Sequence, residues 1–340
     1  MTSQASGGTA AQNPAGIAEL DAERQRDRAV YGEGALVVCD RVVRIYAGDG
    51  VEVQALQGLD LLVAEGELTA IIGASGSGKS TLMNILAGLD TPTAGAVRVA
   101  GHDLGAMTGR ERLGYRRRVV GFIWQQTSRN LLPYLTGRQN VLLPMRLAGL
   151  RRRDRERRAD ELLGALGVAG CAGRTPERMS GGEQQRTAIA TALANGPRLL
   201  LADEPTGELD TASARDVFTA LQAANTELGA TVLVVTHDPA VSGQVRRTVA
   251  IRDGRTSSET LRHGAEDGRA GAGHVAVEYA VLDRAGRVQL PREMVSRLGM
   301  RDRVRLEEEP DHIGVWPDRV TRPAAPAEPG TGPDTAPGED

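Results

Sequence analysis

Lysine is nearly absent from this sequence, which contains one lysine, Lys79, against 40 arginines. Aromatic residues make up 3% of the chain, and the arginine- and alanine-rich composition is typical of a GC-rich genome. A lysine that persists under such a bias is there either by drift or because the wide, planar guanidinium of arginine does not fit its position. A tight phosphate-binding loop is one such position, and composition alone leaves both explanations open.

Cysteine, long apolar runs and net charge are scarce as well. The two cysteines, Cys39 and Cys171, show no C-x-x-C spacing, which argues against disulfides and structural zinc and suits a reducing cytoplasm. No apolar run approaches the roughly 20 residues that a membrane helix needs, so we expect no membrane span in this chain. The formal net charge of −3 argues against nucleic acid as a partner of the whole chain.

Between residues 34 and 262, short apolar runs alternate with helical stretches. This alternation predicts an α/β core around a largely parallel sheet. Residues 154–166 predict an amphipathic helix with an arginine-rich outer face, inside a helical insertion where strand signals lapse. The expected strands of the core are 35–38, 68–72, 119–124, 198–202, 231–236 and 248–251.

Composition divides the chain into a main domain, a small β-rich module and three segments without a core of their own. The first of these segments is expected to be a disordered leader with one short helix at residues 17–30, and the last a proline-rich tail. The predicted parts are the leader 1–33, the main domain 34–262, a glycine-rich linker 263–273, the module 274–318 and the tail 319–340. Within the module, strands are expected at 275–282, 287–290 and 304–308, and a short helix at 291–298.

A loop with the pattern G-x-x-x-x-G-K-[ST] lies between the expected strand 68–72 and a helical stretch. In such a loop the backbone N–H groups turn toward phosphate, and the helix N-terminus adds its positive end. Lys79 would reach the β and γ phosphates, and Ser80 would offer an oxygen to Mg²⁺. A chance glycine-rich turn is the alternative, but the flanking strand and helix favour a phosphate site. The residues concerned are Gly73, Ser75, Gly76, Ser77, Gly78, Lys79, Ser80 and Thr81.

Two adjacent acids, Asp203 and Glu204, end a second apolar strand. Asp203 at a buried strand end can hold the shell of a Mg²⁺ ion, and Glu204 can orient or deprotonate an attacking water. Without the phosphate loop upstream, the pair would be interpreted as solvated acids in a turn.

A second helix start, Ser180-Gly181-Gly182, also offers N–H groups to an anion. It is too far along the chain to belong obviously to the same phosphate, so it could serve the nucleotide of a neighbouring subunit. Standing alone, it would be an ordinary serine N-cap.

These residues, in this order, resemble the ATP-binding subunits of ABC transporters. The resemblance implies a P-loop fold with a mostly parallel core sheet, an antiparallel β subdomain and a helical subdomain. The motifs that carry it, over residues 34 to about 262, are Gly73–Thr81 (Walker A), Gln125 (Q-loop), Ser180–Gln184 (signature), Leu199–Glu204 (Walker B), Gly207–Asp210 (D-loop) and His237 (switch).

The resemblance implies ATP and Mg²⁺ as cofactors and a role for each motif residue. Glu204 would be the general base, assisted by Lys79, Gln125 and His237, and Asp203 would hold Mg²⁺ together with Ser80 and Gln125. Tyr46 would stack on adenine, although an aromatic residue on an edge strand is the alternative. Across the seam of a head-to-tail homodimer, the ATP of one subunit would meet Ser180, Gly181, Gly182 and Asp210 of the other.

Residues 130–136 and 204–210 resemble the lipoprotein-release and macrolide-export branch of this family, whose permeases are FtsX-like. The resemblance implies a separate integral membrane permease as partner and a location at the cytoplasmic face of the cell membrane. Met179 and Thr191 depart from the family pattern without removing a catalytic group. The arginine runs 116–118 and 151–158 could face lipid headgroups or permease loops, or form a solvated helix face.

Residues 278–316 resemble the SpoVT-AbrB swapped-hairpin fold, through the pattern G-R-V-x-L-P, a short helix and a following strand. Such units usually pair, and many bind DNA. Residues 274–318 contain seven arginines and nine acids, a balance of −2 that disfavours phosphate contacts. We therefore expect dimerisation or regulation from this module.

The sequence is compatible with two alternative functions. The first is the ATPase subunit of an ABC transporter, and the second is a soluble ABC-type switch that acts on DNA or a protein through its C-terminal module. The transported substrate and the permease lie outside what this chain encodes.

Overall fold

The computed structural model describes residues 31–48, 50–126, 129–263, 275–283 and 286–318. It divides the chain into two units, residues 1–289 and 290–340. The predicted tail and leader helix, with nearly all of the linker, lie outside the described residues. Within these ranges, no helix is long and apolar enough to cross a membrane.

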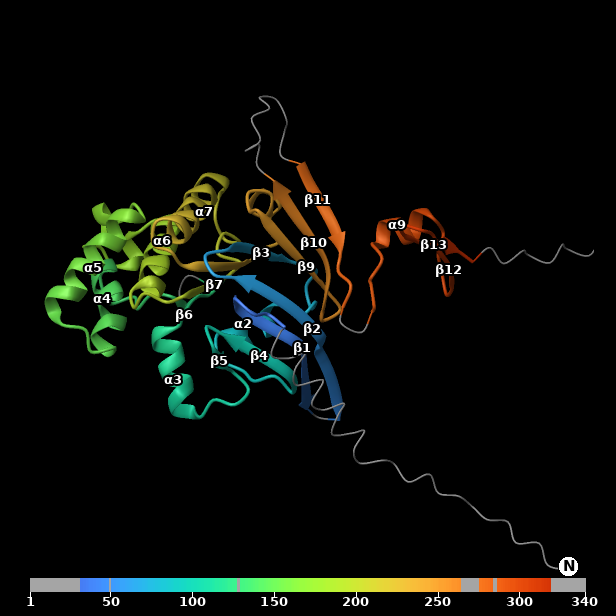
Figure 1. Cartoon of the computed structure of the whole chain (residues 1–340). Coiled ribbons are helices and arrows are strands. Elements are labelled where there is room, and N and C mark those ends of the chain that lie inside the picture. The colour runs from blue at the N-terminus through green and yellow to red at the C-terminus, as the bar shows by residue number, and fades with distance from the viewer. Residues whose placement is uncertain (1–30, 49, 127–128, 264–274, 284–285, 319–340) are drawn as a thin grey trace, which may run out of the picture. The chain divides into compact units, whose positions relative to one another are not determined.

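The first unit is built on a seven-stranded sheet (Figure 1). Five neighbouring strands run parallel, which confirms the predicted α/β core, and the last two continue the sheet antiparallel. The central strands are apolar and buried on both faces, as a parallel sheet between two layers requires. In spatial order the strands are β11 (Val275–Ala280), β10 (Arg255–His263), β9 (Arg247–Arg252), β3 (Leu68–Ile72), β8 (Thr231–Val235), β7 (Leu199–Asp203) and β6 (Val120–Ile123).

A four-stranded antiparallel sheet forms a second layer of the same unit. Its long hairpin extends well past the strand predicted at 35–38. The inner half of the hairpin is largely apolar and buried, whereas the outer half is exposed and mixes apolar residues such as Val51 and Val53 with polar ones. The alternation of valine with Glu52 and Gln54 is a local strand signal that the prediction missed. The strands, in spatial order, are β2 (Val51–Ala64), β1 (Ala35–Gly48), β4 (Ala94–Val99) and β5 (His102–Asp103).

The helices begin at residues that the sequence marks as caps. Thr108, Thr136 and Ser180 each form a capping box. The side chain of the capping residue accepts from the N–H of the third helical residue, and the side chain of that residue, a Glu or Gln, accepts from the N–H of the capping residue. The amphipathic helix predicted at 154–166 is confirmed as α5. The helices of the first unit are α2 (Lys79–Leu86), α3 (Gly109–Arg118), α4 (Gly137–Leu147), α5 (Arg152–Ala165), α6 (Gly181–Leu193), α7 (Thr211–Thr226) and α8 (Pro239–Ser242).

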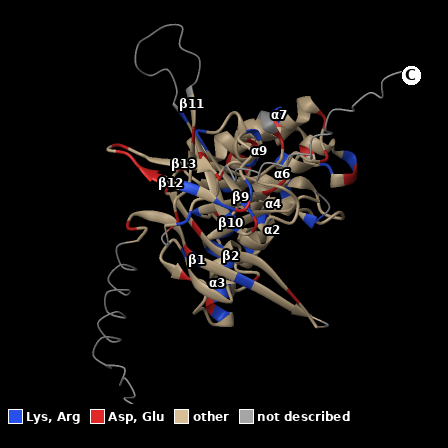
Figure 2. Ribbon diagram, turned by 90° about the vertical axis from the view of Figure 1, so that its right-hand side faces the viewer, with Lys and Arg blue, Asp and Glu red and all other residues tan. Residues whose placement is uncertain are grey.

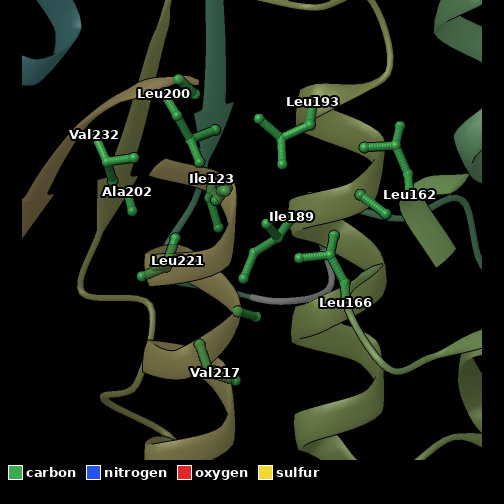
Figure 3. Close-up of a cluster of buried hydrophobic side chains, with 14 of the residues drawn as sticks. Ile123, Leu162, Leu166, Ile189, Leu193, Leu200, Ala202, Val217, Leu221 and Val232 are labelled. Atoms are coloured by element: carbon green, nitrogen blue, oxygen red, sulfur yellow. The ribbon is translucent and has the colours of Figure 1, made fainter. Parts of the chain in front are cut away.

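One hydrophobic cluster joins the helical subdomain to the sheet (Figure 3). Ile189 and Leu193 of α6 lie between α5 on one side and the sheet residues Leu200 and Ile123 on the other. All of these side chains are at most a few per cent exposed. Burying a side chain of this size stabilises a fold by about 1.5–3 kcal/mol, so the cluster holds α6, and the helix start at Ser180, in place against β6 and β7.

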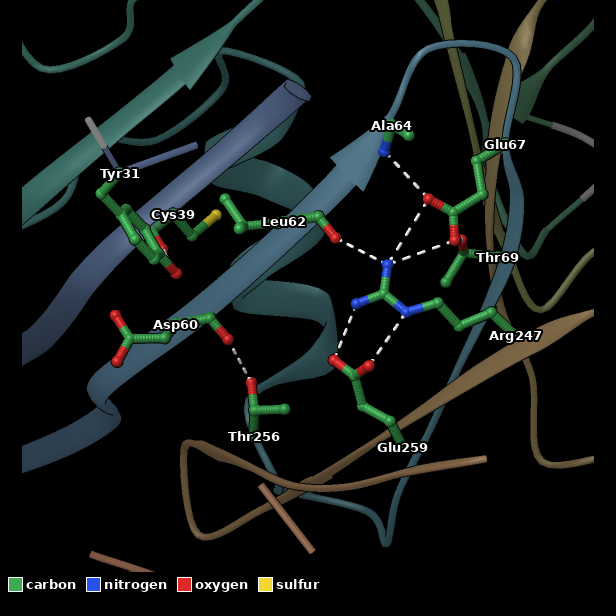
Figure 4. Close-up of polar contacts among 10 residues, drawn as sticks. All are labelled: Tyr31, Cys39, Asp60, Leu62, Ala64, Glu67, Thr69, Arg247, Thr256 and Glu259. Carbon is green, nitrogen blue, oxygen red and sulfur yellow. Dashed lines mark hydrogen bonds and ion pairs between the residues drawn. The ribbon is translucent and has the colours of Figure 1, made fainter. Parts of the chain in front are cut away.

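A network of charged side chains joins β9 to both sheets (Figure 4). The Arg247 guanidinium donates to both carboxylate oxygens of Glu259, to Glu67 and to the carbonyl of Leu62. Each of the three charged side chains is about a fifth exposed. Because the guanidinium serves two carboxylates and a carbonyl, removing it leaves several half-buried acceptors without a donor.

We expect the substitution Arg247→Met to lower the free energy of unfolding by about 2 kcal/mol, below the range for fully buried pairs because these groups are partly solvated. The matched control is Arg198→Met, since Arg198 pairs with Glu65 on the surface, where both side chains are at least half exposed. Urea unfolding followed by circular dichroism measures both variants. Equal losses in the two would show that the Arg247 network adds no more stability than a surface pair.

The second unit contains α9 (Arg292–Arg297) and a hairpin of β12 (Val304–Glu308) and β13 (Ile313–Pro317). The helix predicted at 291–298 and the strand predicted at 304–308 are confirmed. The strand expected at 287–290 is reduced to one bridge between Leu282 and Val288. Strand β11 pairs with β10 over six residue pairs, so the predicted module 274–318 contributes residues to both units.

Candidate active site

The glycine-rich loop 73–78 connects β3 to α2, as its pattern predicts. Gly73 and Gly78 have φ values of 156° and 102°, and a Cβ on either would lie within 2.6 Å of a backbone oxygen. The loop therefore passes too close to Ile251 and Ala55 to accept side chains at these two positions. Its backbone N–H groups remain available at the start of α2.

Lys79 and Ser77 are the buried polar residues of this loop. Lys79 Nζ donates to the carbonyls of Gly73 and Ala74, at 2.7 and 2.8 Å. The Ser77 hydroxyl is buried and has no hydrogen-bond partner within the described part of the chain. A buried cation and an unsatisfied hydroxyl in one loop suit an anionic ligand with several oxygen acceptors. The neighbouring Ser75, Gly76 and Ser80 are exposed, and Thr81 is half-buried.

Asp203 and Glu204 follow β7 at the same edge of the sheet. Asp203 lies opposite Val235 in the parallel register, and Ile71 lies opposite Val235 on the other side, so three strand ends meet there. Burial raises the pKa of Asp203 above its usual range, Glu204 raises it further, and Lys79 lowers it. The two carboxylates thus repel each other in a half-buried position, which favours a cation beside Asp203.

Glu204 is held in an unusual backbone conformation. Its φ is 46°, in the left-handed region, and its N–H donates to the carbonyl of Val235 at 2.9 Å. Its Oε2 lies 2.9 Å from Nδ1 of His237, which follows β8. A carboxylate only accepts hydrogen bonds, so Nδ1 carries the proton when Glu204 is ionised. A cavity of about 300 Å³ is lined by Glu204, Thr206, Gly207, Leu209, Thr236, His237 and Asp238.

Gln125 lies just past the end of β6, the strand beside β7. Its side chain is exposed, and its two neighbours are bound through their backbone by the side chain of Asn130. Parallel strands therefore bring the loop 73–78, Gln125, the two acids and His237 to one edge, from positions up to 164 residues apart.

Ser180 and Asp210 lie at the starts of two helices that pack against each other. The Ser180 hydroxyl caps α6, and Asp210 caps α7 through the N–H groups of Ala212 and Ser213. Hydrogen bonds from Ser213 lower the pKa of Asp210. A Cβ on Gly182 would lie 3.2 Å from the Cβ of Ser213, a tight contact that a small shift between the two helices would have to relieve. Ser180, Gly181 and Asp210 are exposed, and Gly182 is buried.

Tyr46 lies on the exposed half of β1. Its hydroxyl donates to Asp90 at 2.8 Å, and the guanidinium of Arg44 stacks on its ring, 4.4 Å from the centroid. Arg44 also pairs with Asp90 at 2.8 Å. One face of the ring is therefore covered by a cation, and a flat ligand could stack only on the other face.

Sequence reasoning overlooked Arg44, Asp90 and Asn130 as supporting residues. Asn130 begins the segment 130–136, which the sequence analysis used only for its resemblance to a family branch. An asparagine directly before an apolar loop is a signal for a side chain that binds backbone groups. Arg44 and Asp90 left no comparable signal, because they are 46 residues apart. Among the described residues, no group of three or more His, Cys, Asp or Glu could hold a metal by itself.

Comparisons with known proteins agree with this geometry. Residues 56–207 match the family model described as ABC transporter. The macrolide export ATP-binding/permease protein MacB of Chromobacterium violaceum is 48% identical over 221 residues, 65% of this chain and 34% of that protein. MacB of Rhodospirillum rubrum is 46% identical over 219 residues, 64% of this chain and 33% of that protein.

A solved structure covers the same part of the chain. It is the dimeric post-hydrolysis state of the ATP-binding cassette MJ0796 bound to ADP and Pi, which is 37% identical. The alignment has a TM-score of 0.61 and covers 67% of this chain and 99% of the cassette. This chain thus spans nearly all of a single cassette but only about a third of the curated relatives that it matches.

Proposed function

Because this chain belongs to the ATP-binding cassettes of ABC transporters, we propose that it hydrolyses ATP to drive a separate membrane permease. The observation that carries the proposal is the contact between Glu204 and His237, 2.9 Å apart at the strand edge that also carries the loop of Lys79. A base beside a phosphate-binding loop is the arrangement that phosphate transfer to water needs.

The loop residues bind the phosphates of ATP. Lys79 exchanges its contacts with the carbonyls of Gly73 and Ala74 for phosphate oxygens, and the unpartnered Ser77 hydroxyl donates to another. The backbone N–H groups at the start of α2 complete the cradle. Tyr46 stacks on the adenine through the ring face that Arg44 leaves open.

Glu204 accepts the proton of the attacking water. The bond from His237 Nδ1 orients its carboxylate, and the backbone bond to Val235 fixes its position at the strand end. The left-handed φ of Glu204 is the strained backbone that active sites often retain. His237 is largely exposed, so Nε2 is open to the γ-phosphate, to which it donates a hydrogen bond only in the form that carries protons on both ring nitrogens.

Asp203, Ser80 and Gln125 fit a Mg²⁺ ion, because all three supply oxygen ligands and the ion keeps several waters of its own. When bound, Mg²⁺ neutralises the charge of the β and γ phosphates. Burial and Glu204 raise the pKa of Asp203, and Lys79 only partly offsets them, so a further cation beside this carboxylate would be favourable.

Two chains close over two ATP molecules, head to tail. Support comes from the exposure of Ser180, Gly181 and Asp210 at the starts of α6 and α7, and from the dimeric state of the similar cassette. The N–H groups at the start of α6 then serve the γ-phosphate of the partner's nucleotide.

The permease is FtsX-like and binds this chain at the cytoplasmic face of the cell membrane. Support comes from the similarity to proteins named ATP-binding/permease. Tagged chain purified from detergent-extracted membranes of its natural host is expected to bring down a protein with several membrane spans. A purely cytosolic complex without such a protein would instead favour the soluble ABC-type switch.

The second unit provides self-association in this proposal. Its hairpin exposes apolar side chains that a two-stranded sheet cannot bury alone. Val304, Leu306, Ile313 and Trp316 are 41%, 65%, 67% and 47% exposed. A second SpoVT-AbrB-like module would cover them.

The module is not expected to bind DNA strongly. Figure 2 shows acidic residues on the hairpin of β12 and β13, where Glu307, Glu308, Glu309 and Asp311 lie together. Such a surface repels phosphate. The full chain should shift duplex DNA only above micromolar concentration at 150 mM salt, as measured by fluorescence anisotropy. A submicromolar, salt-sensitive shift would favour the DNA-acting switch.

A further inference from the structure

The side chain of Asn130 binds the backbone on both sides of Gln125. Asn130 Oδ1 accepts from the N–H of Trp124 at 2.8 Å, and its Nδ2 donates to the carbonyl of Trp124 at 2.9 Å. Nδ2 also donates to the carbonyl of Gln126 at 3.4 Å. The amide therefore binds both neighbours of Gln125 in the manner of an adjacent strand, and leaves the side chain of Gln125 exposed.

The far end of the same loop is held by a second asparagine. Asn140, on α4 and 3% exposed, accepts from the N–H of Leu132 at 2.7 Å. Its Nδ2 donates to three carbonyls, those of Leu132, Leu135 and Thr136. The two amides bind the loop on either side of Leu131, which is itself buried.

Three hydrogen bonds of the Asn130 amide go to backbone groups of Trp124 and Gln126, the two residues that flank Gln125. An exposed polar side chain on a loop loses its position unless the backbone beneath it is fixed. The bonds of Asn130 supply that fixation at the edge of the sheet where Asp203 ends β7.

We propose that Asn130 is the positioning residue for Gln125 in ATP hydrolysis, and that Asn140 ties this position to helix α4. The inference rests on the proposed function, because Gln125 acts only when ATP and Mg²⁺ are bound. Asn130 acts on Gln125 through the backbone of Trp124 and Gln126. A shift of Gln125 by about 1 Å would weaken its hold on the ion and on the attacking water, and misplacements of that size cost up to about a hundredfold in rate.

The test compares Asn130→Ala with Asn225→Ala in the full chain. Asn225 is the matched control, because its Nδ2 also clamps a loop through two carbonyls, those of Gly66 and Ala230. For Asn130→Ala we expect kcat to fall about tenfold, the Mg²⁺ concentration for half-maximal rate to rise, and the KM for ATP to change less than twofold. For Asn225→Ala we expect unchanged kinetics.

A spectroscopic readout accompanies the kinetics. The chain has two tryptophans, and Trp316→Phe leaves Trp124, beside Gln125, as the sole reporter. In that background, addition of Mg²⁺ to the ATP-bound chain should change Trp124 fluorescence, and Asn130→Ala should reduce the change. If the alanine variant does not fold, Asn130→Asp, which keeps the acceptor for the Trp124 N–H and loses both donors, replaces it with the same expectations.

The possible outcomes distinguish a failure of the proposed function from a failure of the positioning role of Asn130. Absence of Mg²⁺-dependent hydrolysis by the unmodified chain would overturn the proposed function. Hydrolysis by the unmodified chain together with unchanged kcat, Mg²⁺ dependence and fluorescence in the Asn130 variant would overturn the positioning role alone. Equal losses in the Asn130 and Asn225 variants would reduce Asn130 to a structural residue.

Discussion

Replacing Glu204 with glutamine is expected to lower the rate of ATP hydrolysis by at least about a hundredfold and to leave ATP binding intact. Glutamine has nearly the shape of glutamate but cannot accept the proton of the attacking water. The backbone bond between Glu204 and Val235 does not depend on the side chain, so the strand end should keep its geometry. Phosphate release in a coupled assay measures the rate, and equilibrium dialysis with ATP measures binding.

The same variant should accumulate as an ATP-bound dimer, because hydrolysis is the step that reopens the two chains in the proposed cycle. Size-exclusion chromatography with and without ATP tests this. Glu227→Gln is the matched control, since Glu227 is exposed at the C-terminal end of α7 and outside the motifs named above, and should behave as the unmodified chain. A Glu204 variant that hydrolysed ATP at the normal rate would refute its role as general base.

Replacing Lys79 with arginine is expected to reduce hydrolysis by about a hundredfold, although the charge is unchanged. Lys79 is 9% exposed, and its Nζ lies within 2.8 Å of two loop carbonyls. A planar guanidinium is wider than an ammonium group and presents its donors in a fixed fork. It would push the loop outward or miss the phosphates, so we expect weaker ATP binding as well as slower turnover.

The control for Lys79→Arg is the reverse exchange at an exposed site, Arg116→Lys on α3. It should leave hydrolysis unchanged, because a solvated side chain tolerates either cation. Near-normal activity of Lys79→Arg would mean that the single lysine of this chain persists by drift. A large loss would explain why one lysine remains among 40 arginines.

Much of the core was predictable because its signals are local. The strands β3 and β8 and the helix α5 were predicted almost to the residue, since an apolar run or an amphipathic period lies within one stretch of chain. The loop 73–78 was predictable for the same reason, as glycines and Lys79 act through the backbone of contiguous residues. The capping boxes at Thr108, Thr136 and Ser180 follow the same local rule.

The rest of the fold and of the candidate site depends on contacts between residues that are far apart in the sequence. The hairpin of β1 and β2 extends into an exposed half that is held by pairing between its two strands and not by burial in the core. The pairing of β11 with β10 was not predicted, because a short strand after a linker can join any open sheet edge. The stacking of Arg44 on the ring of Tyr46 depends on Asp90, which binds both side chains. No local sequence pattern connects Asp90 to either residue.

The sequence by itself determined the chemistry of this protein: which residues could bind phosphate, hold Mg²⁺ or take a proton, and that each lies at the end of a strand. Only the tertiary structure decided that Glu204 and His237, 33 residues apart, meet at 2.9 Å, and that Asn130 holds the backbone around Gln125. The physical reason is that strand order in a parallel sheet is set by the packing of the whole core. A motif specifies the conformation of its own backbone. Which residues lie beside it in the sheet depends on how the whole core is buried, and no local pattern shows that.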